Sequence, residues 1–324
     1  MSKRIRVGIL GCASIAKRSL APSFAAHDAF ELAAVASRTA GKAVAFAGQY
    51  GARPCTYDEL VDASDVDFVY CPLPTGLHHE WVGKCLRGGK HVLCEKSLAC
   101  TFDEVHDLVE IARSRKLFLM ESFQFCFHAQ NLFVRQLLAD GAIGPIRQVV
   151  VRFGIPPFPE GAANIRYSKE LGGGALLDNG AYTVKATTYL LGSDIKVLAA
   201  MRGGGTDELG GVDLTGSIMM RTKEGIPIQT AYGFDHFYQN GYEIWGKNGK
   251  IVTTRAFTAR DDFDAPVIVE TLSGRETKTF RDNHFARLLD YIAKTISAGE
   301  FEAEYLECET QARILQMVGE VSQR

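Results

Sequence analysis

The sequence contains no run of about 18 uncharged apolar residues, so it predicts no membrane-spanning helix. It also lacks an excess of charge of one sign, because 36 Lys and Arg against 38 Asp and Glu give a net charge of −2. A nucleic-acid-binding protein normally shows a basic excess or stripe, and this balance argues against that class. We therefore expect no nucleic-acid and no membrane partner.

Cysteines with metal-binding spacing are missing as well. The eight cysteines are scattered through the chain, and none belongs to a C-x-x-C pair. This spacing argues against a zinc site, and we expect no metal. Most of the cysteines stand among apolar residues, as small buried hydrophobes do, which makes a reducing cytoplasm the expected location.

What is present is enough sequence for about two globular domains. The chain has 324 residues, of which 46% are hydrophobic and 23% are charged, an ordinary globular composition. We expect a dinucleotide-binding domain at residues 1–122. Residues 123–324 are expected to bind the substrate and to form the oligomer.

The first of these domains alternates short apolar runs with helical patterns. Near-continuous apolar strands that alternate with helices predict a parallel sheet covered on both faces, so the fold class is α/β, a doubly wound Rossmann domain. We expect strands at Val7–Leu10, Glu31–Ala36, Val66–Cys71, His91–Cys94 and Leu117–Met120, and helices from Ser14 and at Ala40–Tyr50, Leu77–Arg87 and Phe102–Arg115, the last with Thr101 as N-cap.

The second domain is richer in strands. After a helix near Asn131–Asp140, the pattern predicts an α+β domain built on a large, mostly antiparallel sheet. We expect helices at Ala181–Leu191, Phe285–Ser297 and Glu307–Ser322, and strands at Ile146–Phe153, Lys196–Met201, Asp213–Arg221, Pro227–Phe234, Tyr242–Trp245, Lys250–Thr254, Val267–Leu272 and Thr277–Phe280.

One face of this second sheet is expected to pack against a partner chain. The alternating residues Ile218, Met220, Ile228 and Thr230 are the ones we assign to the exposed face. The prediction is a homodimer or a homotetramer.

A dinucleotide-binding fingerprint stands where the first strand meets the first helix. The pattern G-x-G-x-x-G/A falls on Gly11, Ala13 and Ala16. The first position makes a tight turn, the second is small so that the backbone can approach a pyrophosphate, and the third lets the helix pack on the strand. An ordinary tight turn in a flavodoxin-like sheet is the alternative. We expect this loop to hold the cofactor through Gly11, Cys12, Ala13, Ser14, Ile15 and Ala16.

The end of the second strand indicates which dinucleotide is bound. It reads Ala36-Ser37-Arg38-Thr39, without the Asp or Glu that usually contacts the ribose of NAD. Ser37 and Arg38 can instead bond to a 2′-phosphate and neutralise it, so the sequence favours NADP(H). A solvated loop charge is the alternative for Arg38.

Further motifs make nearly the whole chain similar to the Gfo/Idh/MocA oxidoreductase family. Residues 71–78 read C-P-L-P-T-G-L-H, residues 89–96 read G-K-H-V-L-C-E-K, and residues 171–182 fit G-G-G-x-x-x-D-x-G-x-H/Y. Residues 120–123 and 127–130 resemble the family's crossover between domains. Residues 11–16, Tyr182 and residues 255–258 are most similar to nucleotide-sugar 3-ketoreductases.

The resemblance implies further cofactor contacts, from the loop after the third strand and from the lysine segment. They are Pro72, Leu73, Thr75, His78, Glu95 and Lys96. For His78, a role in capping its loop is an equal alternative. The chain departs from the family at Ser97, where proline is usual, and at Cys126, where relatives often have Arg.

The chemistry of a ketone reduction assigns roles to three of these residues. Hydride transfer leaves an alkoxide, which needs a proton donor. Lys96 follows the fourth strand, at the edge where open α/β sheets bind ligands. Tyr182 can also donate a proton, and the sequence does not choose between the two. Asp178 stands four residues before Tyr182, on the same helix face. Its carboxylate can keep Lys96 protonated and correctly oriented.

Each of these residues has a plainer alternative, which the sequence leaves open. Lys96 could be a surface lysine in a loop, Asp178 could cap a helix beside the glycines, and Tyr182 could be a core aromatic. Arg166 is expected either to contact a phosphate or hydroxyl of the substrate or to be a surface arginine.

The sequence therefore predicts an NADP(H)-dependent oxidoreductase that acts on a sugar-like carbonyl or secondary alcohol. The expected substrate is a nucleotide-linked 3-keto-deoxyhexose. A dehydrogenase of free sugars, cyclitols or trans-dihydrodiols is one alternative. A catalytically silent NADP-binding regulatory protein is another, and intact Lys96, Asp178 and Tyr182 argue against it.

Overall fold

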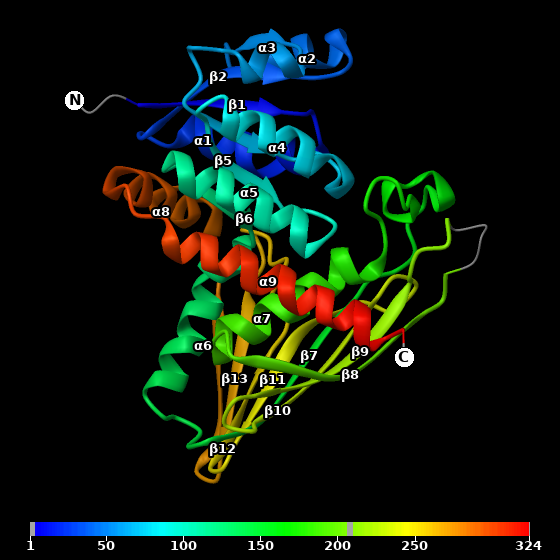
Figure 1. Ribbon diagram of the computed structural model, residues 1–324. Helices are drawn as coiled ribbons and strands as arrows, with labels where there is room; N and C mark the ends of the chain where they lie inside the picture. Colours follow the sequence, from blue (N-terminus) through cyan, green and yellow to red (C-terminus); the bar gives the residue numbers. More distant parts are fainter. Residues whose placement is uncertain (1–3, 206–209, 324) are drawn as a thin grey trace. The chain divides into compact units, whose positions relative to one another are not determined.

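The computed structural model describes residues 4–205 and 210–323, which fold into two compact units (Figure 1). The first unit runs to Ser122 and includes Phe285–Glu309; the second comprises Phe123–His284 and the chain from Thr310. Residues 285–309 follow the second unit in sequence but pack in the first. Tyr305, for example, donates a hydrogen bond to the Leu117 carbonyl at 2.5 Å.

Six strands of the first unit form one parallel sheet, in the order β3-β2-β1-β4-β5-β6. Because the strand order reverses between β1 and β4, a ligand crevice is expected at the carboxyl ends of these two strands. This order confirms the predicted doubly wound sheet. The strands are β1 (Ile5–Leu10), β2 (Phe30–Ala36), β3 (Arg53–Cys55), β4 (Phe68–Cys71), β5 (His91–Glu95) and β6 (Leu119–Ser122).

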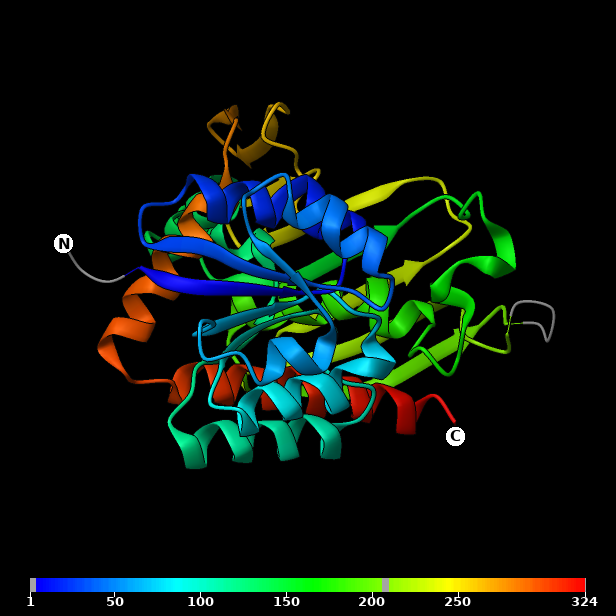
Figure 2. The ribbon, with the colours of Figure 1, turned by 90° about the horizontal axis from the view of Figure 1, so that it is seen from above.

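Helices cover both faces of this sheet, with α1 on one side and α4 and α5 on the other (Figure 2). The first helix begins at Ser14 and contains a π-helical turn at Ala16–Leu20 before α1. Thr101 caps α5, as predicted, and shares a capping box with Glu104. The helices are α1 (Ala21–Ala26), α2 (Ala40–Ala47), α3 (Tyr57–Val61), α4 (His78–Arg87), α5 (Phe102–Arg115), α8 (His284–Ala298) and α9 (Glu302–Val321).

The sequence analysis missed β3 and α3. Strand β3 is three residues long and has Pro54 at its centre. Proline cannot donate a ladder hydrogen bond, so it is confined to an edge strand, and β3 lies at the sheet edge. Such a strand has too little apolar sequence to be recognised by pattern.

The second unit contains an eight-stranded, mostly antiparallel sheet, as predicted. Its order is β14-β13-β12-β11-β7-β10-β9-β8, and β10 pairs with β7 in parallel. The strands are β7 (Ile146–Gly154), β8 (Ile195–Gly203), β9 (Thr215–Thr222), β10 (Pro227–Gly233), β11 (Gln239–Gly246), β12 (Gly249–Thr253), β13 (Ala265–Thr271) and β14 (Gly274–Phe280).

The face of this sheet that the sequence analysis assigned to solvent is in fact the core face. Ile218, Met220, Ile228 and Thr230 are only 1–4% exposed. They lie on the side where α6 (Ala129–Ala139), α7 (Ala181–Leu191) and the last turns of α9 pack. Side chains alternate along a strand, so a pattern reveals two faces without saying which one a helix covers.

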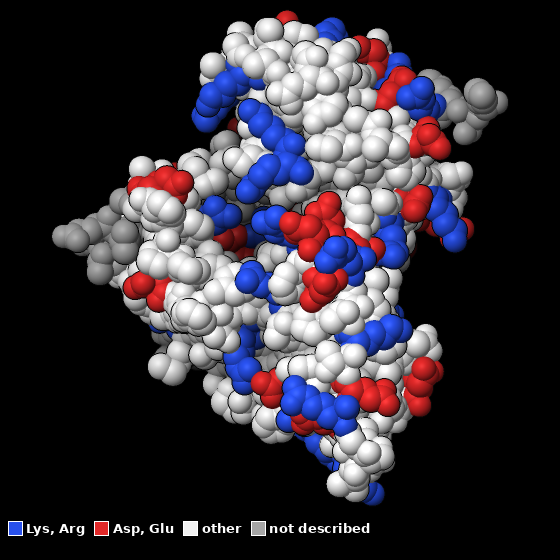
Figure 3. Space-filling model, turned by 180° about the vertical axis from the view of Figure 1, so that it is seen from behind, with Lys and Arg blue, Asp and Glu red and all other residues white. Residues whose placement is uncertain are grey.

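The opposite face carries the exposed side chains. Met201 is 77% exposed, Met219 52%, Leu198 48% and Trp245 40%. We call this surface the outer sheet face. Charged residues of both signs lie on the molecular surface (Figure 3). Within the described residues, helices of the length and apolar character needed to cross a membrane are absent.

Two buried tyrosines on the core face differ in what their hydroxyls contact. Tyr242 of β11 donates a hydrogen bond to Asn131 Oδ1 at 2.7 Å. Tyr232 of β10 is 1% exposed, and its hydroxyl has no hydrogen-bond partner among the described residues. A buried polar group without a partner destabilises the fold, whereas a satisfied one does not.

We therefore expect opposite effects from the same substitution. Tyr232→Phe should raise the free energy of unfolding by about 1 kcal/mol, because it removes an unsatisfied hydroxyl. The matched variant Tyr242→Phe should lower it by about 1–2 kcal/mol, because Asn131 loses its donor. Urea denaturation measures both, and equal losses of stability would show that the Tyr232 hydroxyl is bonded after all.

Candidate functional site

The turn after β1 has the geometry that a dinucleotide loop requires. Gly11 has a φ of +121°, a conformation that L side chains rarely adopt, and its N–H donates to the Ala36 carbonyl at 3.0 Å. A Cβ at this position would lie 2.9 Å from Leu73 Cδ2. Ala16 is fully buried, as a small residue that packs helix against strand should be. The turn therefore fits a bound dinucleotide, and the first N–H groups of the helix that follows point toward its amino end.

Two residues at the tip of β2 complete this region. Ser37 is buried, and its Oγ accepts a hydrogen bond from the Thr39 N–H at 3.2 Å. Arg38 is exposed. An exposed guanidinium beside the glycine turn fits a phosphate group better than it fits a ribose diol.

Tyr57 is a neighbour of this region that the sequence analysis missed. Its hydroxyl would lie 3.8 Å from a Cβ at Gly11, and its ring meets Trp81 edge to face at 5.0 Å. Burial raises the pKa of Tyr57, and the charge of Arg38 offsets part of that shift. The capping box of Thr56 and Glu59 was the available signal, since it marks the helix start on which Tyr57 stands.

Lys96 directly follows β5, at the carboxyl edge of the parallel sheet, and is partly buried. Its neighbour Glu95 accepts a hydrogen bond from the Tyr70 hydroxyl at 2.7 Å. Burial raises the pKa of Tyr70, so this hydroxyl stays a donor at neutral pH. Leu73, in the loop after β4, meets the Gly11 turn as described above. Pro72 and Thr75 belong to the same loop.

The His78 ring lies between the loop after β4 and the loop after β5. The ring is fully buried; Nδ1 lies 2.8 Å from the Ser97 carbonyl oxygen and Nε2 lies 2.7 Å from the Leu73 carbonyl oxygen. Both nitrogens therefore face backbone groups of neighbouring loops. Of the two roles considered from the sequence, the geometry favours holding the loops.

The ring also stands beside two thiols. Ligand atoms of Cys71, His78 and Cys94 lie within 4.8 Å of one another, a grouping that sequence spacing alone did not indicate. Cys71 and Cys94 are register partners on β4 and β5, so the parallel sheet brings them together. A metal would need the lone pair of one His78 nitrogen, and a carbonyl oxygen lies 2.8 Å from Nδ1 and another lies 2.7 Å from Nε2, where the metal would have to stand.

In the second unit, Arg166 and Asp178 form an ion pair. Arg166 lies on a short 3-10 helix, Ile165–Tyr167, and Asp178 lies on the π-helical turn that precedes α7. The distance from Arg166 Nε to Asp178 Oδ2 is 2.5 Å, and the Asp178 side chain is 15% exposed. The charge of Asp178 raises the pKa of Arg166, with a further contribution from Tyr182. Arg166, Asp178 and Tyr182 thus form one polar group.

Tyr182 is positioned by aromatic packing. Its ring centroid lies 5.1 Å from that of Phe153 and 5.4 Å from that of Phe123, both in edge-to-face geometry. Phe125 and Phe257 lie within 6.0 Å. These contacts fix the ring, and its partial exposure leaves room for a reacting group.

The glycine-rich segment before Asp178 closes the loop that carries Arg166. Gly173 N–H donates to the Ser168 carbonyl and Gly174 N–H to the Arg166 carbonyl, at 2.8 and 2.9 Å. A Cβ on Gly173 would lie 2.4 Å from the Arg166 carbonyl oxygen. This close approach explains why the segment needs glycine.

The helix that follows is capped by a residue that the sequence analysis did not single out. Asp213 Oδ2 accepts a hydrogen bond from the Leu176 N–H at 2.8 Å. Burial raises the pKa of Asp213. Because Asp213 provides this cap, Asp178 is left to pair with Arg166. The predicted contact between Asp178 and Lys96 stays a prediction.

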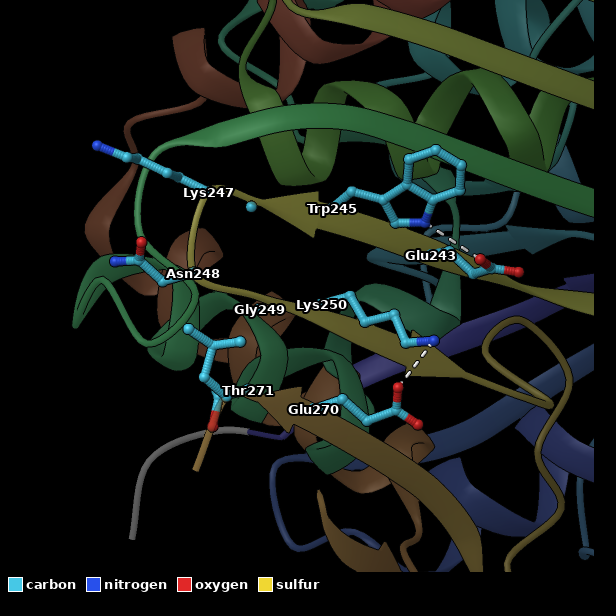
Figure 4. A pocket seen from close by; sticks show the side chains of 10 residues that line it. Glu243, Trp245, Lys247, Asn248, Gly249, Lys250, Glu270 and Thr271 are labelled. Carbon is cyan, nitrogen blue, oxygen red and sulfur yellow. Dashed lines mark hydrogen bonds and ion pairs between the residues drawn. The ribbon is translucent and has the colours of Figure 1, made fainter. Parts of the chain in front are cut away.

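A hollow of about 480 Å³ lies on the outer sheet face, where β11 and β13 end and β12 begins (Figure 4). Trp245, Lys250 and Glu270 line it, but none of the predicted site residues do. Two of its charged groups, Lys250 and Glu270, form an ion pair at 2.8 Å.

Comparison with known proteins places both units in one family. Residues 5–123 match the oxidoreductase family with an NAD-binding Rossmann fold, and residues 132–252 match the GFO/IDH/MocA C-terminal domain. The chain is 42% identical to dTDP-3,4-didehydro-2,6-dideoxy-alpha-D-glucose 3-reductase of Saccharopolyspora spinosa, over 83% of this chain and 80% of the relative. It is 31% identical to D-xylose 1-dehydrogenase (NADP(+)) 2 of Haloferax volcanii, over 90% and 89% of the two chains.

A solved structure extends the likeness to three dimensions. The 3-ketoreductase KijD10 of Actinomadura kijaniata, in complex with NADP and TDP-benzene, is 36% identical and covers 98% of both chains, with a TM-score of 0.93. Its variants with a lysine replaced by alanine and with a tyrosine replaced by phenylalanine were solved with the same ligands. With a Rossmann unit, a matching second unit and relatives above 30% identity along most of its length, this chain belongs to the Gfo/Idh/MocA family of oxidoreductases.

Proposed function

We propose that the protein is an NADP(H)-dependent 3-ketoreductase of a nucleotide-linked deoxyhexose. The observation that carries the proposal is the agreement of both units, over 98% of the chain, with a 3-ketoreductase that binds NADP and TDP-benzene. The Gly11 turn and Arg38 support the same cofactor. When bound, the nicotinamide supplies the hydride or receives it.

The chain's own residues supply the proton and the orientation. Reduction of a ketone leaves an alkoxide, and Lys96 and Tyr182 are the two predicted proton donors. Arg166 and Asp178 form the polar group beside Tyr182, where they can bind substrate hydroxyl or phosphate groups. A reducing cytoplasm is the proposed location, since it suits the scattered cysteines.

Oxidation of a free sugar is the second candidate. A specific observation favours it, because the D-xylose dehydrogenase of Haloferax volcanii aligns with 90% of this chain. The 42% identity to the Saccharopolyspora spinosa reductase favours the nucleotide sugar instead. The assay described below separates the two.

Arg38 should determine the preference for NADP(H) over NAD(H). Arg38→Ala removes a charge-assisted contact to the 2′-phosphate and should weaken NADP(H) binding by roughly 1.5–3 kcal/mol, about tenfold or more. Binding of NAD(H), which lacks this phosphate, should change little. Fluorescence titration of both cofactors measures the ratio, and an unchanged preference would remove Arg38 from the site.

Turnover should depend on the predicted proton donor. With NADPH and dTDP-3,4-didehydro-2,6-dideoxy-α-D-glucose, the wild type should oxidise the cofactor, whereas D-xylose with NADP+ should react far more slowly. Lys96→Met should lower turnover by about 10²–10⁴-fold if Lys96 is the donor, and Tyr182→Phe should do so if Tyr182 is the donor. NADPH binding should persist in both variants, because Gly11 and Arg38 are intact.

Turnover is measured from the nicotinamide absorbance across a range of pH. The proton donor is the residue whose replacement removes an ionisation from the pH dependence of turnover. Near wild-type turnover in both variants would remove these residues from the chemistry. Faster reaction with D-xylose than with the nucleotide sugar would favour the second candidate function.

We also propose that the outer sheet face joins two copies of the chain. Met201, Met219 and Trp245 expose apolar surface on it, and Arg152 and Glu243 form an ion pair there at 2.8 Å. A sheet face with this mixture suits an isologous contact between copies. The face differs from the one named from the sequence, but the assembly proposed is the same.

Light scattering at micromolar concentration should report a dimer or tetramer. Met219→Glu should shift the assembly toward monomer, because it places a charge among Ala199 and Gln229, the register partners of Met219. Lys223→Glu, in the turn beyond β9, is a charge control away from the strand. A monomeric wild type would contradict the proposal.

A further inference from the structure

The loop that carries Lys96 is held at several points by buried groups. This loop, residues 95–98, is called the lysine loop below. Ser97 and Leu98 are each 2% exposed. Leu98 N–H donates to Glu121 Oε1 at 3.0 Å, and the Tyr70 hydroxyl donates to Glu95 at 2.7 Å. These bonds fix the loop before and after Lys96.

His78 contacts the residue that directly follows the lysine. Its Nδ1 lies 2.8 Å from the carbonyl oxygen of Ser97, the residue that follows Lys96. The ring is fully buried at the start of α4, so the helix fixes its position. Serine does not restrict its own φ as a proline would, and the loop therefore depends more on such hydrogen bonds for its shape.

We propose that His78 is a positioning residue, which aims Lys96 by donating a hydrogen bond from Nδ1 to the Ser97 carbonyl. The proposal rests on the proposed function, in that Lys96 is taken to act in the reduction. A neutral imidazole has a single N–H, and donation to Ser97 requires that it be at Nδ1. Burial opposes the doubly protonated ring, because it lowers the pKa of His78.

Two substitutions separate the two ring nitrogens. The amide nitrogen of asparagine can take the place of Nδ1 and still donate to Ser97. That of glutamine reaches the place of Nε2, from which it can donate only to Leu73. Both side chains are polar amides, so the cost of burying them is similar. His79→Gln is the control, because the His79 ring contacts Asp107 at an exposed site.

The expected result is a difference in turnover between the two variants. His78→Gln should lower kcat by about 10²-fold, because misplacing a reacting group by about 1 Å costs this much. His78→Asn should keep at least tenfold more of the wild-type kcat than His78→Gln does. The dissociation constant of NADPH should change little in either variant. Equal kcat in the two variants, or a higher kcat for His78→Gln, would overturn the proposal.

Two measurements test the hydrogen bond without turnover. Hydrogen exchange of the Leu98 amide should be faster in His78→Gln than in the wild type and should stay slow in His78→Asn. The same difference is expected in the absence of ligand and in the presence of NADPH. Nitrogen-15 NMR of the wild type should show a protonated Nδ1 on His78, even if the variants fail to fold. A proton on Nε2 alone would refute the proposal. A wild type without activity but with the expected exchange and NMR results would instead count against the proposed function.

Discussion

Parallel pairing of β1, β4 and β5 is the constraint on which the first unit's chemistry depends. Because the strands run in one direction, their carboxyl ends lie at one edge, and the loops that follow them meet there. Gly11 follows β1 at this edge and has a positive φ that glycine adopts readily. A side chain at this position would collide with Leu73 of the loop after β4. Lys96 follows the third of these strands. One hydrogen-bonding pattern therefore places the cofactor turn and the lysine.

Side chains then determine how precisely these loops are held. The imidazole of His78 lies between the carbonyls of Leu73 and Ser97 and, as a neutral ring, can donate to one of them, while the Glu121 carboxylate accepts from Leu98. Such buried polar groups are stable only when they are paired, so each of them limits the positions open to the loop. A flexible lysine on a loop held in this way can be aimed reproducibly.

The second unit positions its polar group by a different means. Glycines at 173 and 174 let the backbone approach closely enough to bring Arg166 to Asp178, while Asp213 caps the helix on which Asp178 and Tyr182 stand. The aromatic rings of Phe153 and Phe123 pack edge to face against the Tyr182 ring and fix its position. The eight-stranded sheet beneath supplies a rigid support for this polar group.

Much of this was already determined by the sequence, where the signals are local. Apolar runs between helical patterns revealed the Rossmann sheet, the Gly11 fingerprint and Arg38 indicated the cofactor, and alternation predicted the eight later strands. Two kinds of feature could not be predicted in this way. Strand β3 is too short for a pattern and contains Pro54, and Asp213 caps a helix that lies 37 residues before it in the chain. Alternation also could not say which face of the second sheet is covered, because a period of two is the same for both faces until helices pack on one of them. Only the tertiary structure decided that face and directed both nitrogens of His78 to backbone carbonyls, because each depends on contacts between segments far apart in the sequence.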